Sequence, residues 1–110
     1  MKPIKFLIVN DTVRFRAVDY HRHLLTPDDN FSQINGGGMI EFDFNNENKT
    51  IRFDGGSADY GTFKPVDLKE AIKNTPDIES SLTTLGKLGY GDDFDISKCR
   101  IFVRDEEIKL

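Results

Sequence analysis

Residues 36–53 read GGGMIEFDFNNENKTIRF, and their pattern is the strongest indication of the fold class. Three glycines open a predicted strand in which apolar and polar side chains alternate, so that one face carries Ile40, Phe42 and Phe44. The polar residues 45–48 predict a turn, and residues 50–53 alternate again as a partner strand. The segment is therefore predicted to be an antiparallel hairpin with its apolar face in the core.

The chain before this hairpin is predicted to form two more strands and a short helix. Ile4–Val9 is apolar and β-branched, as in a buried strand, and Lys5 is its one charged residue. After a turn signal at residues 10–12, apolar and basic side chains alternate over residues 13–16, which favours a half-exposed strand. Ala17–Leu25 has apolar residues at helical spacing and is predicted to be a helix, which Pro27 would end; a polar loop follows.

The chain after the hairpin is predicted to hold a loop, a helix and a last strand. Gly55–Gly61 is too rich in glycine for the interior of an element and predicts a tight loop. Pro65 suits the first turn of a helix, which the apolar spacing extends to Asn74. Ile78–Asp95 stays ambiguous, because its leucines favour a helical turn and its glycines oppose a long helix. Residues 99–104 predict a strand.

These elements predict a single α+β domain over residues 1–110. Its sheet is expected to be mixed or antiparallel, with about five to six strands, and two helices are expected to pack on it. A length of 110 residues with 37% hydrophobic residues suits one small core. The hairpin opposes a doubly wound α/β fold, because that fold needs strict alternation of strands and helices.

Composition excludes several classes of function. The chain has 15 Lys and Arg against 19 Asp and Glu, and a formal net charge of −4 disfavours nucleic-acid binding. The longest apolar run, Phe6–Val9, is too short to span a membrane, and a signal-peptide pattern is lacking. Cys99 is the single cysteine, so an internal disulfide is excluded. We therefore expect a cytoplasmic protein without nucleic-acid or membrane partners; its oligomeric state cannot be deduced from the sequence.

The two histidines, His21 and His23, are the first candidates for chemistry. Two residues apart on a helix, their side chains would point about 200° apart, which opposes a shared metal ion. We therefore predict no metal and no cofactor. Two solvated helix histidines are the alternative interpretation. In the C-terminal part of the chain, Asp92, Asp93 and Asp95 lie close together in the sequence, but they lack the glycine and terminal glutamate of a calcium loop and are interpreted as a solvated turn.

The glycine loop and a set of basic residues suggest a phosphate site. Glycines allow successive backbone N–H groups to converge on an anion, and Gly55–Gly61 includes Ser57. The loop also fits an ordinary turn, because neither a Walker A motif nor a dinucleotide motif is present. Lys5, Arg14 and Arg16 could supply positive charge, although solvated charges at a sheet edge are the commoner case.

Four motifs in this order resemble the 14 kDa phosphohistidine phosphatase family, also called Janus/Ocnus. They are Lys5 in an aromatic and apolar first strand, Tyr20-His21, the triple glycine before Met39-Ile40, and the loop Gly55-Gly56-Ser57-Ala58-Asp59-Tyr60-Gly61. The resemblance covers about residues 5–77, and the glycine triplet together with Gly-x-Ser-x-x-Tyr-Gly is its most specific part.

The resemblance implies a metal-independent phosphatase that hydrolyses phosphohistidine, or a related phosphoramidate, in proteins or peptides. By this likeness His21 is the catalytic general base, and Ser57 with the loop around Ala58 and Asp59 holds the phosphate. Lys5 adds positive charge, and Arg14 matches a family arginine only with a shift of one residue. An imidazole with a pKa near 6.5 can accept a proton from water at neutral pH, which agrees with the role of His21.

Three departures from the family pattern leave alternatives open. Met39 stands where the family often has a basic residue, Asp59 brings a negative charge into the loop, and the chain beyond about Asp77 differs. A carboxylate near a phosphate repels it. A catalytically inactive, phosphatase-like binding or interaction module would show the same mixture. A third interpretation is that the chain is a small protein that acts by covering the surface of another protein.

Overall fold

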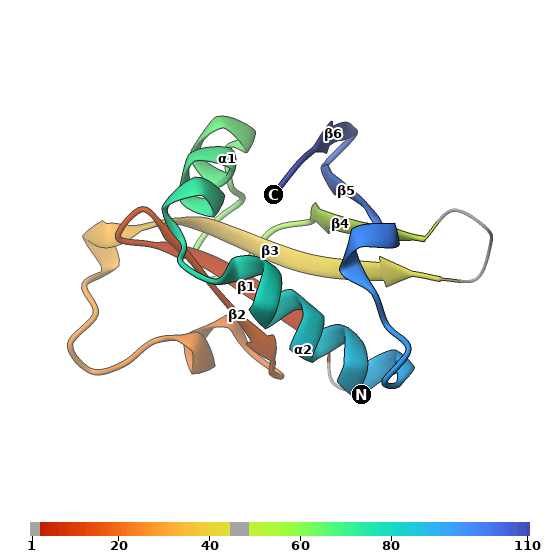
Figure 1. The fold of residues 1–110 in the computed structure, drawn as a ribbon. Helices are drawn as coiled ribbons and strands as arrows, with labels where there is room; N and C mark the ends of the chain where they lie inside the picture. The colour runs from red at the N-terminus through yellow and green to blue at the C-terminus, as the bar shows by residue number, and fades with distance from the viewer. Residues whose placement is uncertain (1–2, 45–48) are drawn as a thin grey trace.

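β3 (Ile34–Asp43) and β4 (Thr50–Asp54) form the predicted hairpin, at the centre of a six-stranded sheet (Figure 1). The computed structural model describes residues 3–44 and 49–110. The strand order is β2-β1-β3-β4-β5-β6, and among these described strands only the β4–β5 pair is parallel. The turn predicted at residues 45–48 lies outside the described residues.

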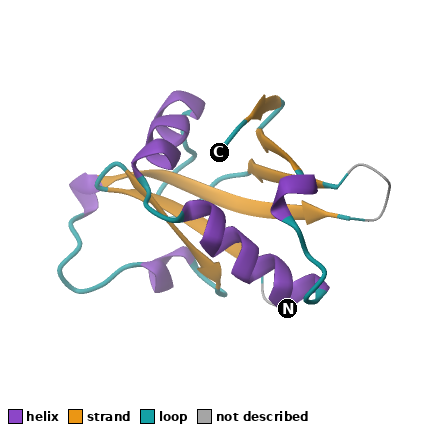
Figure 2. Cartoon of the chain, in the orientation of Figure 1, coloured by secondary structure: helices purple, strands orange, loops and turns teal. Residues whose placement is uncertain are grey.

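The remaining elements surround this hairpin, with the α-helices on one face of the sheet (Figure 2). They are β1 (Ile4–Val9), β2 (Thr12–Ala17), a 3₁₀ helix at His21–Leu24, another at Phe31–Gln33, α1 (Pro65–Asn74), α2 (Ile78–Tyr90), a 3₁₀ helix at Ile96–Lys98, β5 (Arg100–Val103) and β6 (Glu106–Ile108). The chain is thus an α+β domain with a mixed sheet and two packed α-helices, as predicted.

Apolar side chains form separate clusters on the two faces of the sheet. Alternate residues of β1 face α1 and α2, where Phe6, Phe53 and Leu68 are fully buried in the main core. The intervening residues of β1 face the other way and join a smaller cluster of Leu7, Val9, Val18 and Leu24. The second face of the sheet therefore has a small apolar cluster of its own, with polar groups around it.

The helix predicted at Ala17–Leu25 is wrong. β2 runs through Ala17, and the N–H of Val18 continues the pairing by donating to the carbonyl of Pro3 at 3.1 Å. Helix begins only at His21 and is a single 3₁₀ segment of 4 residues. Strand pairing with β1 thus overrides the local apolar spacing. The glycine triplet also lies inside β3, which begins two residues earlier at Ile34, rather than opening it.

The ambiguous segment after residue 77 forms the long helix α2, and its glycine serves packing. A Cβ on Gly86 would lie 2.4 Å from the ring of Phe94, so the glycine lets this ring cover the helix. The last predicted strand is β5, while β6 was not predicted because its 3 residues are mostly charged. The helix of residues 65–74 is confirmed. In the part of the chain that the structure describes, none of the helices combines the length and apolar character needed to cross a bilayer.

Candidate functional site

The candidate site lies on the sheet face opposite α1 and α2, above the glycine triplet of β3. Lys5 shares this face with Leu7 and Val9, because side chains alternate along β1. Leu7 pairs with Gly37, which has no side chain to cover the sheet there. The ring of His21 occupies this space: a Cβ on Gly37 would lie 3.4 Å from Cδ2 of His21. The triplet thus forms the floor under the imidazole.

His21 is held in one orientation by the backbone of β3. Its side chain is buried, and its Nε2 lies 2.8 Å from the carbonyl oxygen of Gly38. Because a carbonyl can only accept a hydrogen bond, Nε2 donates and Nδ1 keeps the lone pair of the neutral ring. The alternative of two solvated histidines is wrong for His21, whereas His23 is exposed.

The surroundings of His21 also set its charge. Burial lowers the pKa of the imidazole below its ordinary value, and the positive charge of Lys5 lowers it further. The hydrogen bond to Gly38 and the negative charge of Asp59 act against this lowering. The net effect keeps His21 neutral at neutral pH, so that it can accept a proton.

The loop of residues 55–61 is a tight turn fastened to the same part of β3. Ser57 and Gly61 exchange backbone hydrogen bonds of 3.1 and 2.8 Å, and the Tyr60 N–H donates to Oγ of Ser57 at 3.2 Å. The carbonyl of Gly61 also accepts from the N–H of Gly37 at 3.1 Å. A positive φ of 83° at Gly61 makes this turn possible without steric strain. The loop is therefore docked beside the floor of His21.

The backbone N–H groups of Ala58 and Asp59, at the tip of this loop, are free to bind a ligand. Ala58 and Asp59 are exposed, and within residues 3–44 and 49–110 their N–H groups have no protein acceptor. Ser57 is buried, and its Oγ accepts from Tyr60, so its hydroxyl proton remains available for donation. The loop can thus offer an anion three donors without using a cationic side chain.

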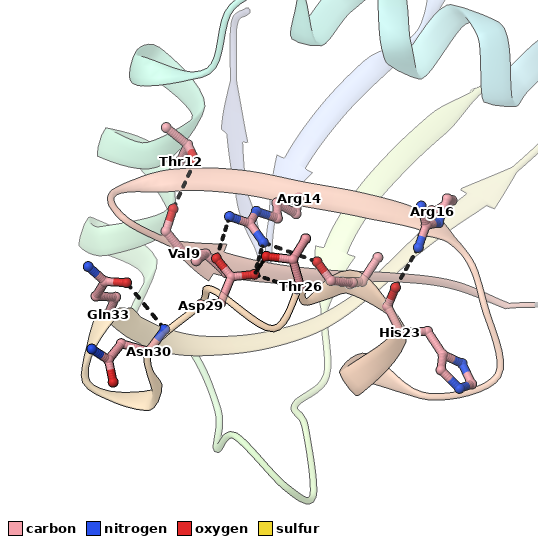
Figure 3. Close-up of polar contacts among 10 residues, drawn as sticks. Val9, Thr12, Arg14, Arg16, His23, Thr26, Asp29, Asn30 and Gln33 are labelled. Carbon is pink, nitrogen blue, oxygen red and sulfur yellow. Dashed lines mark hydrogen bonds and ion pairs between the residues drawn. The ribbon is translucent and has the colours of Figure 1, made fainter.

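The predicted cations have different surroundings. Lys5 is half-buried, stands opposite Arg16 and Met39 in the sheet, and has no carboxylate partner in the described part of the chain. Arg14 instead forms hydrogen bonds of 2.5 and 2.8 Å to the carboxylate of Asp29 (Figure 3). This guanidinium holds the pKa of the Asp29 carboxyl well below its usual range. Arg14 therefore anchors the loop before β3, and its charge is already matched.

The structure thus brings His21, Lys5, Ser57 and Asp59 into one region, with Ala58 on the same loop. The carbonyl of Gly38, which orients the imidazole, was missed in the sequence, although the glycine triplet marks its place. Asp59 lies close enough to His21 to raise its pKa, so this carboxylate belongs to the site's surroundings. Among the described residues, no three His, Cys, Asp or Glu side chains gather as metal ligands.

No protein-family model, curated protein or solved structure matches the chain.

Proposed function

We propose that the protein is a metal-independent phosphatase that hydrolyses phosphohistidine, or a related phosphoramidate, in proteins or peptides. The observation that carries this proposal is the buried, neutral His21, whose Nε2 is committed to Gly38 while Nδ1 keeps its lone pair. A neutral imidazole with a lone pair on Nδ1 and a fixed orientation suits removal of a proton from water. The motif resemblance points to the same chemistry.

The residues around His21 can each take a separate role in the reaction. The free N–H groups of Ala58 and Asp59 and the Ser57 hydroxyl would hold the phosphoryl oxygens, and Lys5 would offset their charge. Water gives a proton to Nδ1 of His21 while its oxygen bonds to phosphorus. The P–N bond breaks, and the leaving nitrogen takes a proton from solvent. No metal ion is needed, since fixed donors stabilise the transferred group.

The test is phosphate release from a histidine-phosphorylated peptide, without added metal and with a chelator present. We expect release by the wild type and a loss of at least about 100-fold in His21→Ala, because general-base catalysis contributes that much. His23→Ala is the matched control, since His23 is exposed and makes no contact with Gly38. Folding of both variants is checked by circular dichroism. Equal rates in wild type and folded His21→Ala would refute the role of His21.

Asp59 favours one second candidate, a module that binds phosphorylated segments without turning them over. Its carboxylate raises the His21 pKa, so it lies near the place where a phosphoryl group would bind. Repulsion there weakens phosphate binding and the stabilisation of transferred charge. Saturable binding of the phosphopeptide by a well-folded wild type that releases no phosphate from several phosphoramidates would select this candidate.

A further inference from the structure

The outer edge of β2 has unpaired backbone groups. β2 is the first strand of the sheet and pairs only with β1 among the described strands. The N–H of Val13 points away from β1, because it donates to Oγ1 of Thr75 at 2.8 Å. Alternation along an antiparallel strand then directs the N–H groups of Phe15 and Ala17 outward as well. In the described part of the chain neither N–H has an acceptor, so the edge is open beyond Val13.

A groove follows this open edge. Its volume is about 300 Å³, and it is lined by β2 from Val13 to Arg16, with Leu24 on the site face and Ser81 of α2 on the other. A groove that runs along a strand edge and has walls on both faces of the sheet suits an extended peptide segment. Such a segment would add to the sheet through backbone hydrogen bonds. The pairing of β2 with β1 runs without a β-bulge, one of the features that usually prevent a further strand from adding to an edge.

The charge along the groove favours an anionic segment on the site face. Arg14 is neutralised by Asp29, whereas the guanidinium of Arg16 has a single hydrogen-bond acceptor among the described residues, the carbonyl of His23 (Figure 3). Arg16 stands directly opposite Lys5, and within the described residues neither has a carboxylate partner. Two like charges opposite each other on a sheet destabilise it, and an anion bound between them would relieve that repulsion.

We propose that the edge of β2 is a docking strand for the extended segment of a phosphorylated peptide. The docked segment adds as a seventh strand, hydrogen-bonded to Phe15 and Ala17. Strand spacing of about 4.8 Å places its backbone about 10 Å from that of Lys5 and about 14 Å from that of Gly38. A side chain of a paired residue is too short to cross that distance, so the phosphorylated residue follows the paired segment and reaches the site past Arg16. This inference rests on the proposed function, because the delivered group is the substrate of His21.

The first test modifies the peptide and leaves the protein unchanged. A nine-residue peptide carrying a non-hydrolysable phosphohistidine analogue is N-methylated at one position at a time, and binding is measured by fluorescence polarisation. Only alternate N–H groups of an added strand face β2, so we expect weakening of about fivefold to tenfold at the two alternate positions that pair with Phe15 and Ala17, and little change at the position between them. Equal effects at neighbouring positions, or none, would overturn the proposal.

The second test modifies the edge. Ala17→Pro removes an outward N–H and no bond to β1, and proline is accepted on edge strands. We expect about tenfold weaker peptide binding, while Ala17→Val, which adds a similar bulk and keeps the N–H, binds within about twofold of the wild type. Wild-type affinity in folded Ala17→Pro would contradict the docking strand.

A small substrate separates this proposal from the proposed function. Free phosphoramidate has no backbone to pair with β2, so Ala17→Pro should hydrolyse it at the wild-type rate while losing peptide affinity. Equal losses on both substrates would show that the substitution damages the site and would overturn the docking strand. Peptide binding with the alternating N-methyl pattern, but no hydrolysis of any phosphoramidate, would refute the phosphatase and support the edge.

Discussion

Gly37→Ala should destabilise the protein strongly, because the close approach of β1 and β3 leaves no room for a side chain. A Cβ at this position would lie 2.4 Å from the carbonyl oxygen of Phe6 and 2.7 Å from Cδ2 of Leu7. The nearest atom belongs to the backbone of β1, so it can retreat only if the strands move apart. Overpacking of this kind costs about 3 kcal/mol, the upper part of the usual range.

This cost can be measured as a change in thermal and urea unfolding. For a domain of this size, about 3 kcal/mol lowers the Tm by roughly 10–20 °C. Gly56→Ala is the matched control, because its Cβ would meet Thr62 at 3.4 Å and its φ is not positive. We expect this variant within about 1 kcal/mol of the wild type. A Gly37→Ala protein as stable as the control would refute the argument from close approach.

Three further predictions concern charged groups. The folded pKa of His21 lies below its unfolded value near 6.5, so the unfolded state binds more protons between the two values. The free energy of unfolding, measured in urea, should therefore fall as the pH drops below about 6.5. His21→Gln should abolish this dependence of the free energy on pH. Asp29→Asn should lower the Tm by about 5 °C at pH 7. This difference should shrink as the pH falls below the usual carboxyl pKa, because Asp29 then takes up a proton in the unfolded state while Arg14 keeps it ionised in the folded state; a difference that stays constant would contradict the ion pair. Asp59→Ala should raise kcat/KM for a phosphopeptide about twofold to fivefold at low salt, with a smaller gain at high salt, and an unchanged value would place its charge outside the phosphate's reach.

Much of the fold could be predicted because its signals are local. The β3–β4 hairpin alternates strictly, and Pro65 marks the start of α1. The 17–25 segment could not be predicted in this way, since its apolar residues fit a helix while the hydrogen bond from Val18 to Pro3 keeps the chain extended. α2 stayed ambiguous because the reason for Gly86 is the ring of Phe94, which lies further along the chain.

The site could be predicted only as a set of residue types. Sequence and resemblance single out His21, Lys5 and Ser57, which the structure brings into one region. Arg14 has the same chemistry as Lys5 in the sequence, yet only its distant partner Asp29 shows that its charge is matched. The hydrogen bond from His21 to Gly38 depends on how β3 passes beneath the 3₁₀ helix of residues 21–24. No local sequence pattern predicts this arrangement.

The opposite effects of Lys5 and Asp59 on His21 suit a base that must change strength when the substrate binds. In the free protein the two charges act in opposite directions, and burial leaves the pKa lowered. A phosphoryl group beside the free N–H groups of Ala58 and Asp59 adds negative charge, which raises the pKa of His21 toward neutral pH. Under the proposed function, the imidazole therefore becomes a stronger base once the phosphate is in place, and it is neutral before that. Asp59 already raises the pKa of His21 in the free protein, but its carboxylate also repels the phosphate. Asp59→Ala should therefore improve phosphate binding more than it improves the rate of the bound complex.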